Sequence, residues 1–283
     1  MSISASQVKE LREMTGVGMM ECKKALVETE GDLEKAIDLL RSNSSLKAEK
    51  KASRVAADGT LVVNQTSSSV TVVEVNTETD FAAKDEKFQN FCNNIKSYLA
   101  QNNVHAIDEI NEAFATERET LVQSIGENIQ IRRMVKVAEG KSIGTYLHTD
   151  GKLAAVVAID ADNADLAKDL AMHVAASNPN CITAEQVDKE LLARERAIYE
   201  AQAAESGKDP SIMEKMIDGK VNRFLSEITL VSQAFVKNPD QTVAALLAEK
   251  NANVVSMSRI KVGEGIEVEK KDFAAEVAAQ LKS

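Results

Sequence analysis

The sequence predicts an α+β fold with a three-helix bundle of the ubiquitin-associated type at the N-terminus, a duplicated core of β-hairpins and helices, an inserted antiparallel helical hairpin and a C-terminal helix. Three observations predict it. Three short segments with helical apolar periodicity, separated by glycines, fill residues 1–45. A hairpin followed by a helix occurs twice, about 85 residues apart. Two amphipathic helices flank a polar turn within residues 184–226.

Capping signals divide residues 1–45 into three helices. Ser4 begins a capping box, and Gly16 closes the first helix. The second helix is predicted over 18–29, and Asp32 caps the third. Small helical bundles of this kind are interaction modules more often than catalysts.

The second helix has one predicted core face, formed by Met19, Cys22, Ala25, Leu26 and Thr29. Met20 lies off this face. An exposed methionine suits an adaptable partner contact, but single exposed apolar residues are common on any protein surface. The sequence leaves both interpretations open.

The first copy of the core follows a basic run, residues 47–54, which is predicted to be a solvated linker. Thr79 supplies a cap for a helix that begins at Asp80. The hairpin strands of this copy are predicted over 59–63 and 70–75, and a helix over 108–125 and a strand over 129–137 are predicted between the two copies.

The second copy opens with a hairpin whose turn is Asp150-Gly151, a strong two-residue turn signal. The helical pair over 184–226 interrupts this copy, and it either projects for docking or folds back onto the core. The other predicted elements are strands over 144–148, 153–159 and 254–262 and helices ending near Pro179, over 242–250 and over 272–281.

These elements predict six segments. They are an N-terminal bundle with its linker (1–54), a core N-subdomain (55–139), the first part of a core C-subdomain (140–183), the helical hairpin (184–226), the second part of the C-subdomain (227–263) and a C-terminal helix module (264–283).

Composition narrows the classes of function. The net charge is −10, so no basic face for neutralising phosphates is expected, and direct nucleic-acid binding is not predicted. No apolar run reaches the roughly 18 residues of a membrane span, and no secretory signal is visible. A cytoplasmic protein is expected. Cys22, Cys92 and Cys181 form no paired motif and are predicted to be buried and reduced.

No complete catalytic motif occurs in the chain. Gly140-Lys141-Ser142 resembles the end of a P-loop, but Val135 stands where the earlier glycine is required. Among the histidines, His148 is expected near a hairpin turn and His173 packed within a helix, while His105 is isolated. A triad assembled in space stays an open alternative, because spacing along the chain does not reveal one. We expect no enzyme active site, metal or cofactor.

Phe81 follows Asp80 at the start of the predicted helix, and Lys84-Asp85 separates it from the apolar stripe. The phenylalanine either closes the start of its own helix as a hydrophobic staple or is held out as a wedge for another protein. The stripe consists of Phe88, Phe91, Cys92, Ile95, Tyr98 and Leu99.

Two stretches resemble the signatures of the bacterial elongation factor Ts family. The first is Val8-Lys9-Glu10-Leu11-Arg12 with Thr15-Gly16-Val17-Gly18-Met19-Met20-Glu21-Cys22-Lys23-Lys24-Ala25-Leu26, and the second is Glu74-Val75-Asn76-Thr77-Glu78-Thr79-Asp80-Phe81. Further agreement lies at 125–128, 173–176 and 262–267, in the same order and at the same spacing. Departures are Glu78 for glutamine, Ala82 for the commoner valine and Ala234 for proline.

The resemblance implies a guanine-nucleotide exchange factor for elongation factor Tu, without covalent chemistry. In that family, the segment matching Thr79, Asp80, Phe81 and Ala82 intrudes between helices of the partner's G domain and disturbs its magnesium and phosphate site. The resemblance also implies contacts of Leu11, Met19 and Met20 with the G domain, contact of His148 with a second partner domain, and self-association through the 184–226 hairpin in some members.

A different class of function stays open beside this one. The N-terminal bundle and the helical hairpin also suit an adaptor that binds ubiquitin-like folds or other helices. The segment 79–81 discriminates between the two, because an adaptor does not require it. A hydrolytic enzyme would need a cleft with perturbed titrating groups, to which nothing in the sequence points.

Overall fold

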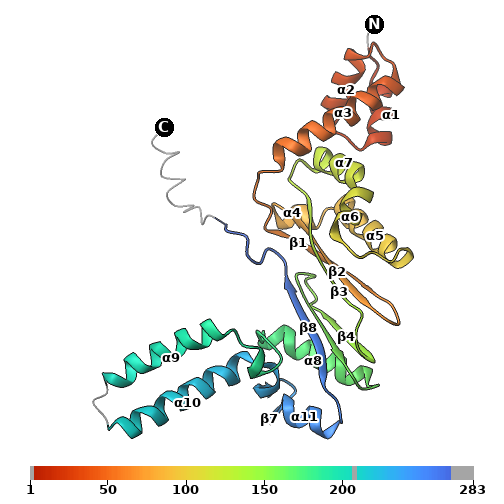
Figure 1. Ribbon diagram of the computed structural model, residues 1–283. Helices are drawn as coiled ribbons and strands as arrows, with labels where there is room; N and C mark the ends of the chain where they lie inside the picture. Colours follow the sequence, from red (N-terminus) through yellow and green to blue (C-terminus); the bar gives the residue numbers. More distant parts are fainter. Residues whose placement is uncertain (1–2, 206–208, 269–283) are drawn as a thin grey trace. The chain divides into compact units, whose positions relative to one another are not determined.

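The computed structural model describes residues 3–205 and 209–268, so the predicted helix over 272–281 lies outside the described residues. The chain divides into two compact units (Figure 1). Among the described residues, the first unit contains 3–62, Val73–Met134 and 262–268, and the second contains Val63–Val72, 135–205 and 209–261. The fold is mixed, with helices and small sheets, as the sequence predicts.

The first unit begins with three helices packed on one another, α1 (Ala5–Thr15), α2 (Met19–Glu28) and α3 (Leu33–Lys51). The predicted Ser4 capping box, the left-handed Gly16 cap and the Asp32 cap are confirmed. Their common core consists of Val8, Leu11, Val17, Cys22, Ala25, Leu26, Ala36 and Leu40. The likeness to ubiquitin-associated bundles stays a prediction.

Two predictions for the bundle are wrong. The sequence predicts Met19 on the core face of α2, yet Met19 is 57% exposed, because it is the first residue of the helix. The sequence predicts a linker over residues 47–54, yet residues 47–51 are the last turns of α3. Lys47 pairs with Glu21, and Ala48 is buried. The run contains strong helix formers, and α3 packs on α7, a contact that spacing along the sequence does not reveal.

A three-stranded sheet follows, with strand order β1-β2-β3. Its strands are β1 (Asp58–Gln65), β2 (Val70–Thr77) and β3 (Gln130–Val137), and its helices are α5 (Glu86–Gln101), α6 (Ile107–Ala113) and α7 (Ala115–Ile125). The predicted stripe on α5 joins the sheet in one apolar core. The predicted single helix over 108–125 is wrong: it is interrupted at Phe114, whose ring makes edge contacts with Phe91 and Tyr98.

The helix predicted from Asp80 onward is also divided into two. The first part, α4 (Asp80–Ala83), has only four residues, and Asp85 then caps α5 through the Lys87 N–H at 2.8 Å. Asp85 has extended backbone angles, as N-cap residues do. Because of this break, α4 does not have to continue along the axis of α5.

The second unit repeats the topology of the first sheet. Its sheet has the order β4-β5-β8, so that in both sheets the return strand of a hairpin is central. The strands are β4 (Ser142–Leu147), β5 (Leu153–Ile159) and β8 (Val254–Lys261), with the helices α8 (Ala164–Ser177) and α11 (Val243–Glu249). These predicted elements are confirmed. Two short strands, β6 (Ala234–Phe235) and β7 (Asn238–Thr242), and two 3-10 turns, Ala184–Gln186 and Leu230–Ser232, were not predicted.

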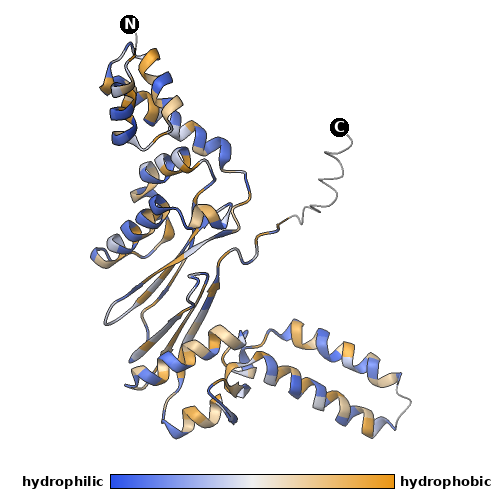
Figure 2. Ribbon diagram, turned by 180° about the vertical axis from the view of Figure 1, so that it is seen from behind, coloured by the Kyte–Doolittle hydropathy of each residue, from blue (hydrophilic) through white to orange (hydrophobic). Residues whose placement is uncertain are grey.

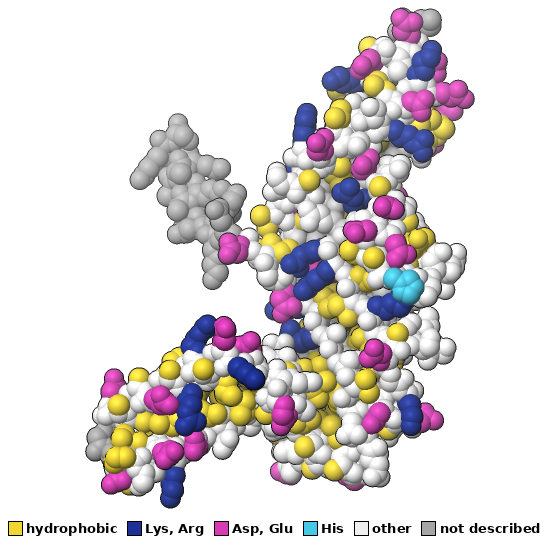
Figure 3. Space-filling view, in the orientation of Figure 1, with side chains coloured by type: hydrophobic (Ala, Val, Ile, Leu, Met, Phe, Trp, Pro, Cys, Tyr) yellow, Lys and Arg dark blue, Asp and Glu magenta, His cyan; other side chains and the backbone are white. Residues whose placement is uncertain are grey.

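The remaining helices, α9 (Lys189–Ala204) and α10 (Pro210–Ile228), pack on each other. Polar and apolar residues alternate along both helices (Figure 2), and hydrophobic side chains gather along the seam between them (Figure 3). No residue of α10, which is described throughout, is fully buried. A pair folded back onto the core would bury part of α10, so this alternative is not what the structure shows.

The cysteines differ in burial. Cys22 and Cys92 are buried, and burial raises the pKa of the Cys92 thiol to about 12. Cys181 is only half-buried, so its predicted burial is wrong. It lies outside a regular helix, in an isolated bridge with Thr229. All three thiols are free.

Gly144 provides a test of the contact between β4 and α8. A β-carbon added at Gly144 would lie 2.0 Å from the Ala167 carbonyl carbon, and backbone cannot move aside as a flexible side chain does. We expect Gly144→Ala to lower the free energy of unfolding by about 2–3 kcal/mol through overpacking. Urea denaturation of the full chain measures this loss.

Gly219, in α10, is the matched control. A β-carbon there meets nothing within 4 Å, so Gly219→Ala should stabilise the helix by roughly 0.5–1 kcal/mol. Equal effects of the two substitutions would contradict the close approach of β4 and α8.

Candidate partner-binding site

The segment 79–83, called here the tip segment, is held by its backbone at the end of β2. Thr79 caps α4, and its hydroxyl accepts the Ala82 N–H at 3.3 Å. Ala82 and Ala83 are 4% and 7% exposed and anchor α4 against the first unit. The backbone of this segment is therefore fixed from both sides of Phe81.

Phe81 projects from this anchored backbone into solvent. Its side chain is 81% exposed, so the hydrophobic-staple interpretation is wrong. The adjacent Asp80 carboxylate accepts a hydrogen bond from the Lys84 ammonium at 2.7 Å, and this bond raises the pKa of Lys84. The tip segment thus presents a bare aromatic ring beside a surface ion pair.

The residue that sequence analysis missed is Glu127, in the loop after α7. Its Oε2 accepts the backbone N–H groups of Glu78 at 3.1 Å and Thr79 at 3.0 Å. Its Oε1 accepts the Thr79 hydroxyl at 2.6 Å. The stretch 125–128 agrees with the family, but nothing in its spacing predicts a contact with a segment 48 residues earlier.

Glu78 makes the reciprocal contact. Its Oε1 accepts the Asn128 N–H at 2.6 Å, and its Oε2 lies 2.8 Å from the Arg54 guanidinium. The Asn128 side chain, 1% exposed, donates to the Ala52 and Arg54 carbonyls. The end of β2, the loop after α7 and the end of α3 are thereby joined.

The three N-terminal candidates differ in accessibility. Met19 and Met20 are 57% and 77% exposed, and Met14 and Val27 are also exposed. Leu11 is fully buried in the bundle core. A direct partner contact through the Leu11 side chain is therefore not what this fold provides, because its neighbours already cover it. Its contribution is to the core that carries Met19 and Met20.

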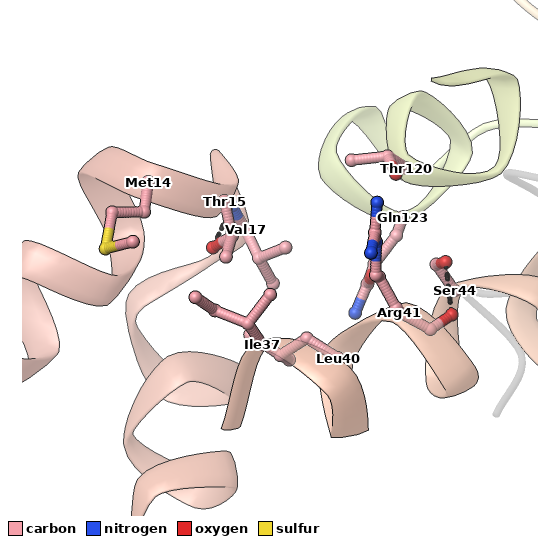
Figure 4. A pocket seen from close by; sticks show the side chains of 9 residues that line it. All are labelled: Met14, Thr15, Val17, Ile37, Leu40, Arg41, Ser44, Thr120 and Gln123. Carbon is pink, nitrogen blue, oxygen red and sulfur yellow. Dashed lines mark hydrogen bonds between the residues drawn. The ribbon is translucent and has the colours of Figure 1, made fainter. Parts of the chain in front are cut away.

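A cavity of about 390 Å³ lies between α1, α3 and α7 (Figure 4). Met14 lines one end, and Arg41 and Gln123 line the cavity toward the other. The further lining residues are Thr15, Val17, Ile37, Leu40, Ser44 and Thr120. Arg41 is the only titratable residue in this lining, so the cavity lacks a paired acid and base.

His148 and His173 have different environments. His148 is exposed near the hairpin turn, and its Nδ1 lies 2.9 Å from the Asp150 carboxylate. The pKa of Asp150 is lowered by the Lys152 N–H and then by His148. His173 is fully buried: Val236 N–H donates to its Nδ1, so Nε2 carries the proton and donates to Gln233. The predicted packing of His173 is confirmed.

No group of three or more His, Cys, Asp or Glu side chains among the described residues is placed to hold a metal ion. Within residues 3–205 and 209–268, none of the helices has the length and apolar character needed to cross a membrane. The accessible chemistry of the tip segment is a hydrophobic ring and a carboxylate on a rigid support. Such a surface suits insertion into a partner protein.

Comparison with known proteins gives a consistent result. The family model described as "Elongation factor TS" matches residues 78–264. A protein of Hahella chejuensis named elongation factor Ts is 52% identical over 284 residues, covering 99% of both chains. Proteins of the same name from Thioalkalivibrio sulfidiphilus (48% identical, 100% of this chain and 99% of the relative) and Francisella tularensis subsp. novicida (46% identical, 99% of both) also match. The chain belongs to the elongation factor Ts family.

Proposed function

We propose that this chain is a guanine-nucleotide exchange factor, which binds elongation factor Tu carrying GDP and promotes GDP release. The observation that carries the proposal is Phe81, 81% exposed on a segment whose neighbours Ala82 and Ala83 are buried. Aromatic side chains supply much of the binding energy at protein–protein interfaces, so an exposed ring on a fixed backbone suits insertion into a partner. Family membership supplies the class of partner.

Nucleotide exchange on elongation factor Tu requires that the factor bind the nucleotide-free and nucleotide-bound forms with different affinities. A factor that binds the nucleotide-free partner more tightly than the nucleotide-bound form weakens nucleotide binding by the same factor, because the two equilibria are linked. In our proposal, Asp80 and Phe81 enter between helices of the partner's G domain and disturb its magnesium and phosphate site. Magnesium bridges phosphate oxygens and neutralises their charge, so its displacement loosens the nucleotide. No nucleophile or general base is needed.

The size of the effect requires more than one contact. Burying one phenylalanine contributes roughly 1.5–3 kcal/mol, which corresponds to one or two powers of ten in an equilibrium constant. A larger effect needs further contacts on the partner. We assign these to Met19 and Met20 on the G domain and, in the second unit, to His148 on another partner domain.

The helical pair α9 and α10 is proposed as a surface for self-association. The side chains of its seam are half-buried at Leu191, Leu192, Met213, Met216, Ile217, Val221 and Phe224. A second helical pair would remove this apolar surface from water. We also propose that the chain acts in the cytoplasm and that it divides into the six segments given above.

The test is release of fluorescent GDP from purified elongation factor Tu in excess unlabelled GDP. We expect release to accelerate with increasing concentration of the chain and then to saturate. Equal release with and without the chain would contradict the exchange function and favour an adaptor. Repeating the measurement on magnesium-depleted elongation factor Tu tests the mechanism, because the acceleration should shrink when the ion is already absent.

A further inference from the structure

We infer that Glu127 is the positioning residue of the tip segment, and that its carboxylate fixes the direction in which Phe81 is presented. The inference rests on the proposed exchange function for its consequence, but its structural part concerns the free chain. Glu127 does not touch the partner in this proposal. It acts through Thr79 and the backbone that carries Phe81.

The hydroxyl of Thr79 shows how this works. A hydroxyl has one hydrogen to donate. Glu127 Oε1 lies 2.6 Å away and is an acceptor, so the hydrogen points to Glu127. A lone pair of the hydroxyl is then left to accept the Ala82 N–H at 3.3 Å. Glu127 thereby orients the cap of α4.

The second oxygen of the same carboxylate fixes the turn into α4. Glu127 Oε2 accepts two consecutive N–H groups, those of Glu78 and Thr79. Convergence on one oxygen restricts the backbone angles where β2 ends. The helix α4 has four residues, far fewer than a helix needs to be stable by itself. Its direction therefore depends on these contacts and on the burial of Ala82 and Ala83.

Glu127 is itself held on rigid backbone. Gly126, with a φ of 89°, closes α7 in the left-handed conformation, and the Lys51 ammonium of α3 donates to the Gly126 carbonyl. On the other side, the buried Asn128 amide donates to the Ala52 and Arg54 carbonyls, just after the end of α3. The Phe81 support and the helix that ends the N-terminal bundle are thus parts of one hydrogen-bonded frame.

The first arm of the test uses the free full-length chain and measures amide hydrogen exchange. Glu127→Ala should accelerate exchange at Thr79, Ala82 and Ala83 by about tenfold or more, the loss expected for hydrogen bonds to a charged group. Amides in the centre of β2 and α5 should be unchanged. Glu112→Ala, which removes an exposed carboxylate from α6, is the matched control and should leave the tip unchanged.

The second arm measures GDP release from elongation factor Tu. Glu127→Ala should lower the maximum release rate at saturation by about tenfold, with little change in the half-saturating concentration, because the contact surfaces remain. A fall in affinity with an unchanged maximum rate would overturn the positioning role. If the unaltered chain does not accelerate GDP release, the proposed exchange function is wrong. Amide hydrogen exchange in the free chain then decides by itself whether Glu127 positions the tip segment.

Two further variants test the positioning role of Glu127 even if Glu127→Ala destabilises the fold of the first unit. Glu127→Gln retains an oxygen for the two N–H groups but places an amide donor against the Thr79 hydroxyl, so an intermediate effect is expected. Thr79→Val removes the hydroxyl, and its combination with Glu127→Ala should cost less than the product of the separate effects. Unchanged tip exchange in Glu127→Gln and Thr79→Val, or fully multiplicative effects, would overturn the inference.

Discussion

Phe81→Ala should reduce the maximum rate of GDP release by roughly 10- to 100-fold, because the ring supplies about 1.5–3 kcal/mol when it is buried in the partner. Complex formation should stay largely intact, since the proposed contacts of Met19, Met20 and His148 remain. The free energy of unfolding should change by less than about 0.5 kcal/mol, because the side chain is 81% exposed in the free chain. Release kinetics over a concentration series separate the two parameters.

Val236→Ala is the matched control for Phe81→Ala. Val236 is an apolar side chain of the second unit, 42% exposed, and it has no assigned role in exchange. Its truncation should leave release unchanged. If Phe81→Ala released GDP as fast as the unaltered chain, the wedge would be refuted, while equal loss in both variants would indicate a nonspecific effect of apolar truncation.

Glu74→Ala should lower the free energy of unfolding by about 3 kcal/mol, because it leaves two arginines facing a site that has lost its charge. Glu74 is fully buried in the centre of β2, where its carboxylate contacts Arg132 at 3.1 Å and also Arg133. The partial exposure of both guanidinium groups places the expected loss at the lower end for buried ion pairs. Glu74 also accepts the Gly263 N–H at 2.8 Å.

The contact with Gly263 gives the Glu74 substitution a local consequence. A β-carbon on Gly263, whose φ is 74°, would lie 2.2 Å from the Ala57 carbonyl oxygen, so this backbone approaches its neighbours closely. Glu74→Ala removes the acceptor of the Gly263 N–H. We therefore expect the stretch 262–268 to detach before the whole unit unfolds. Limited proteolysis should cut there faster in Glu74→Ala than in Glu112→Ala, and equal cutting would contradict a role of the Glu74–Gly263 hydrogen bond in holding this stretch.

Glu74 also predicts a pH dependence. Burial would raise the pKa of Glu74, but hydrogen bonds from Gly263, Asn76 and Arg133 outweigh burial and hold the pKa below its ordinary value. A carboxylate with a depressed pKa in the folded chain contributes stability above its ordinary value, and this contribution is lost as the pH falls through the folded value. Stability should therefore decline as the pH falls below about 4.5. In Glu74→Gln this decline should be smaller; an identical acid profile would contradict the assignment.

Local signals in the sequence determined the local elements. The Ser4 capping box, the Asp32 cap and the Asp150-Gly151 turn use side chains and backbone within a few residues of each other, so they were predictable. Where a helix end depended on distant packing, prediction failed. The last turns of α3 are helical against α7, and the break at Phe114 depends on the rings of Phe91 and Tyr98.

For the candidate site, the sequence determined which residues bear the family signature, including Asp80 and Phe81. Only the tertiary structure decided how each is used: Phe81 is exposed, Met19 leaves the core face and Leu11 is enclosed. It also brought Glu127 to Thr79 across 48 positions of the chain. Capping and turn chemistry act over a few residues, whereas burial and a carboxylate's choice of donors depend on which segments the folded backbone places together.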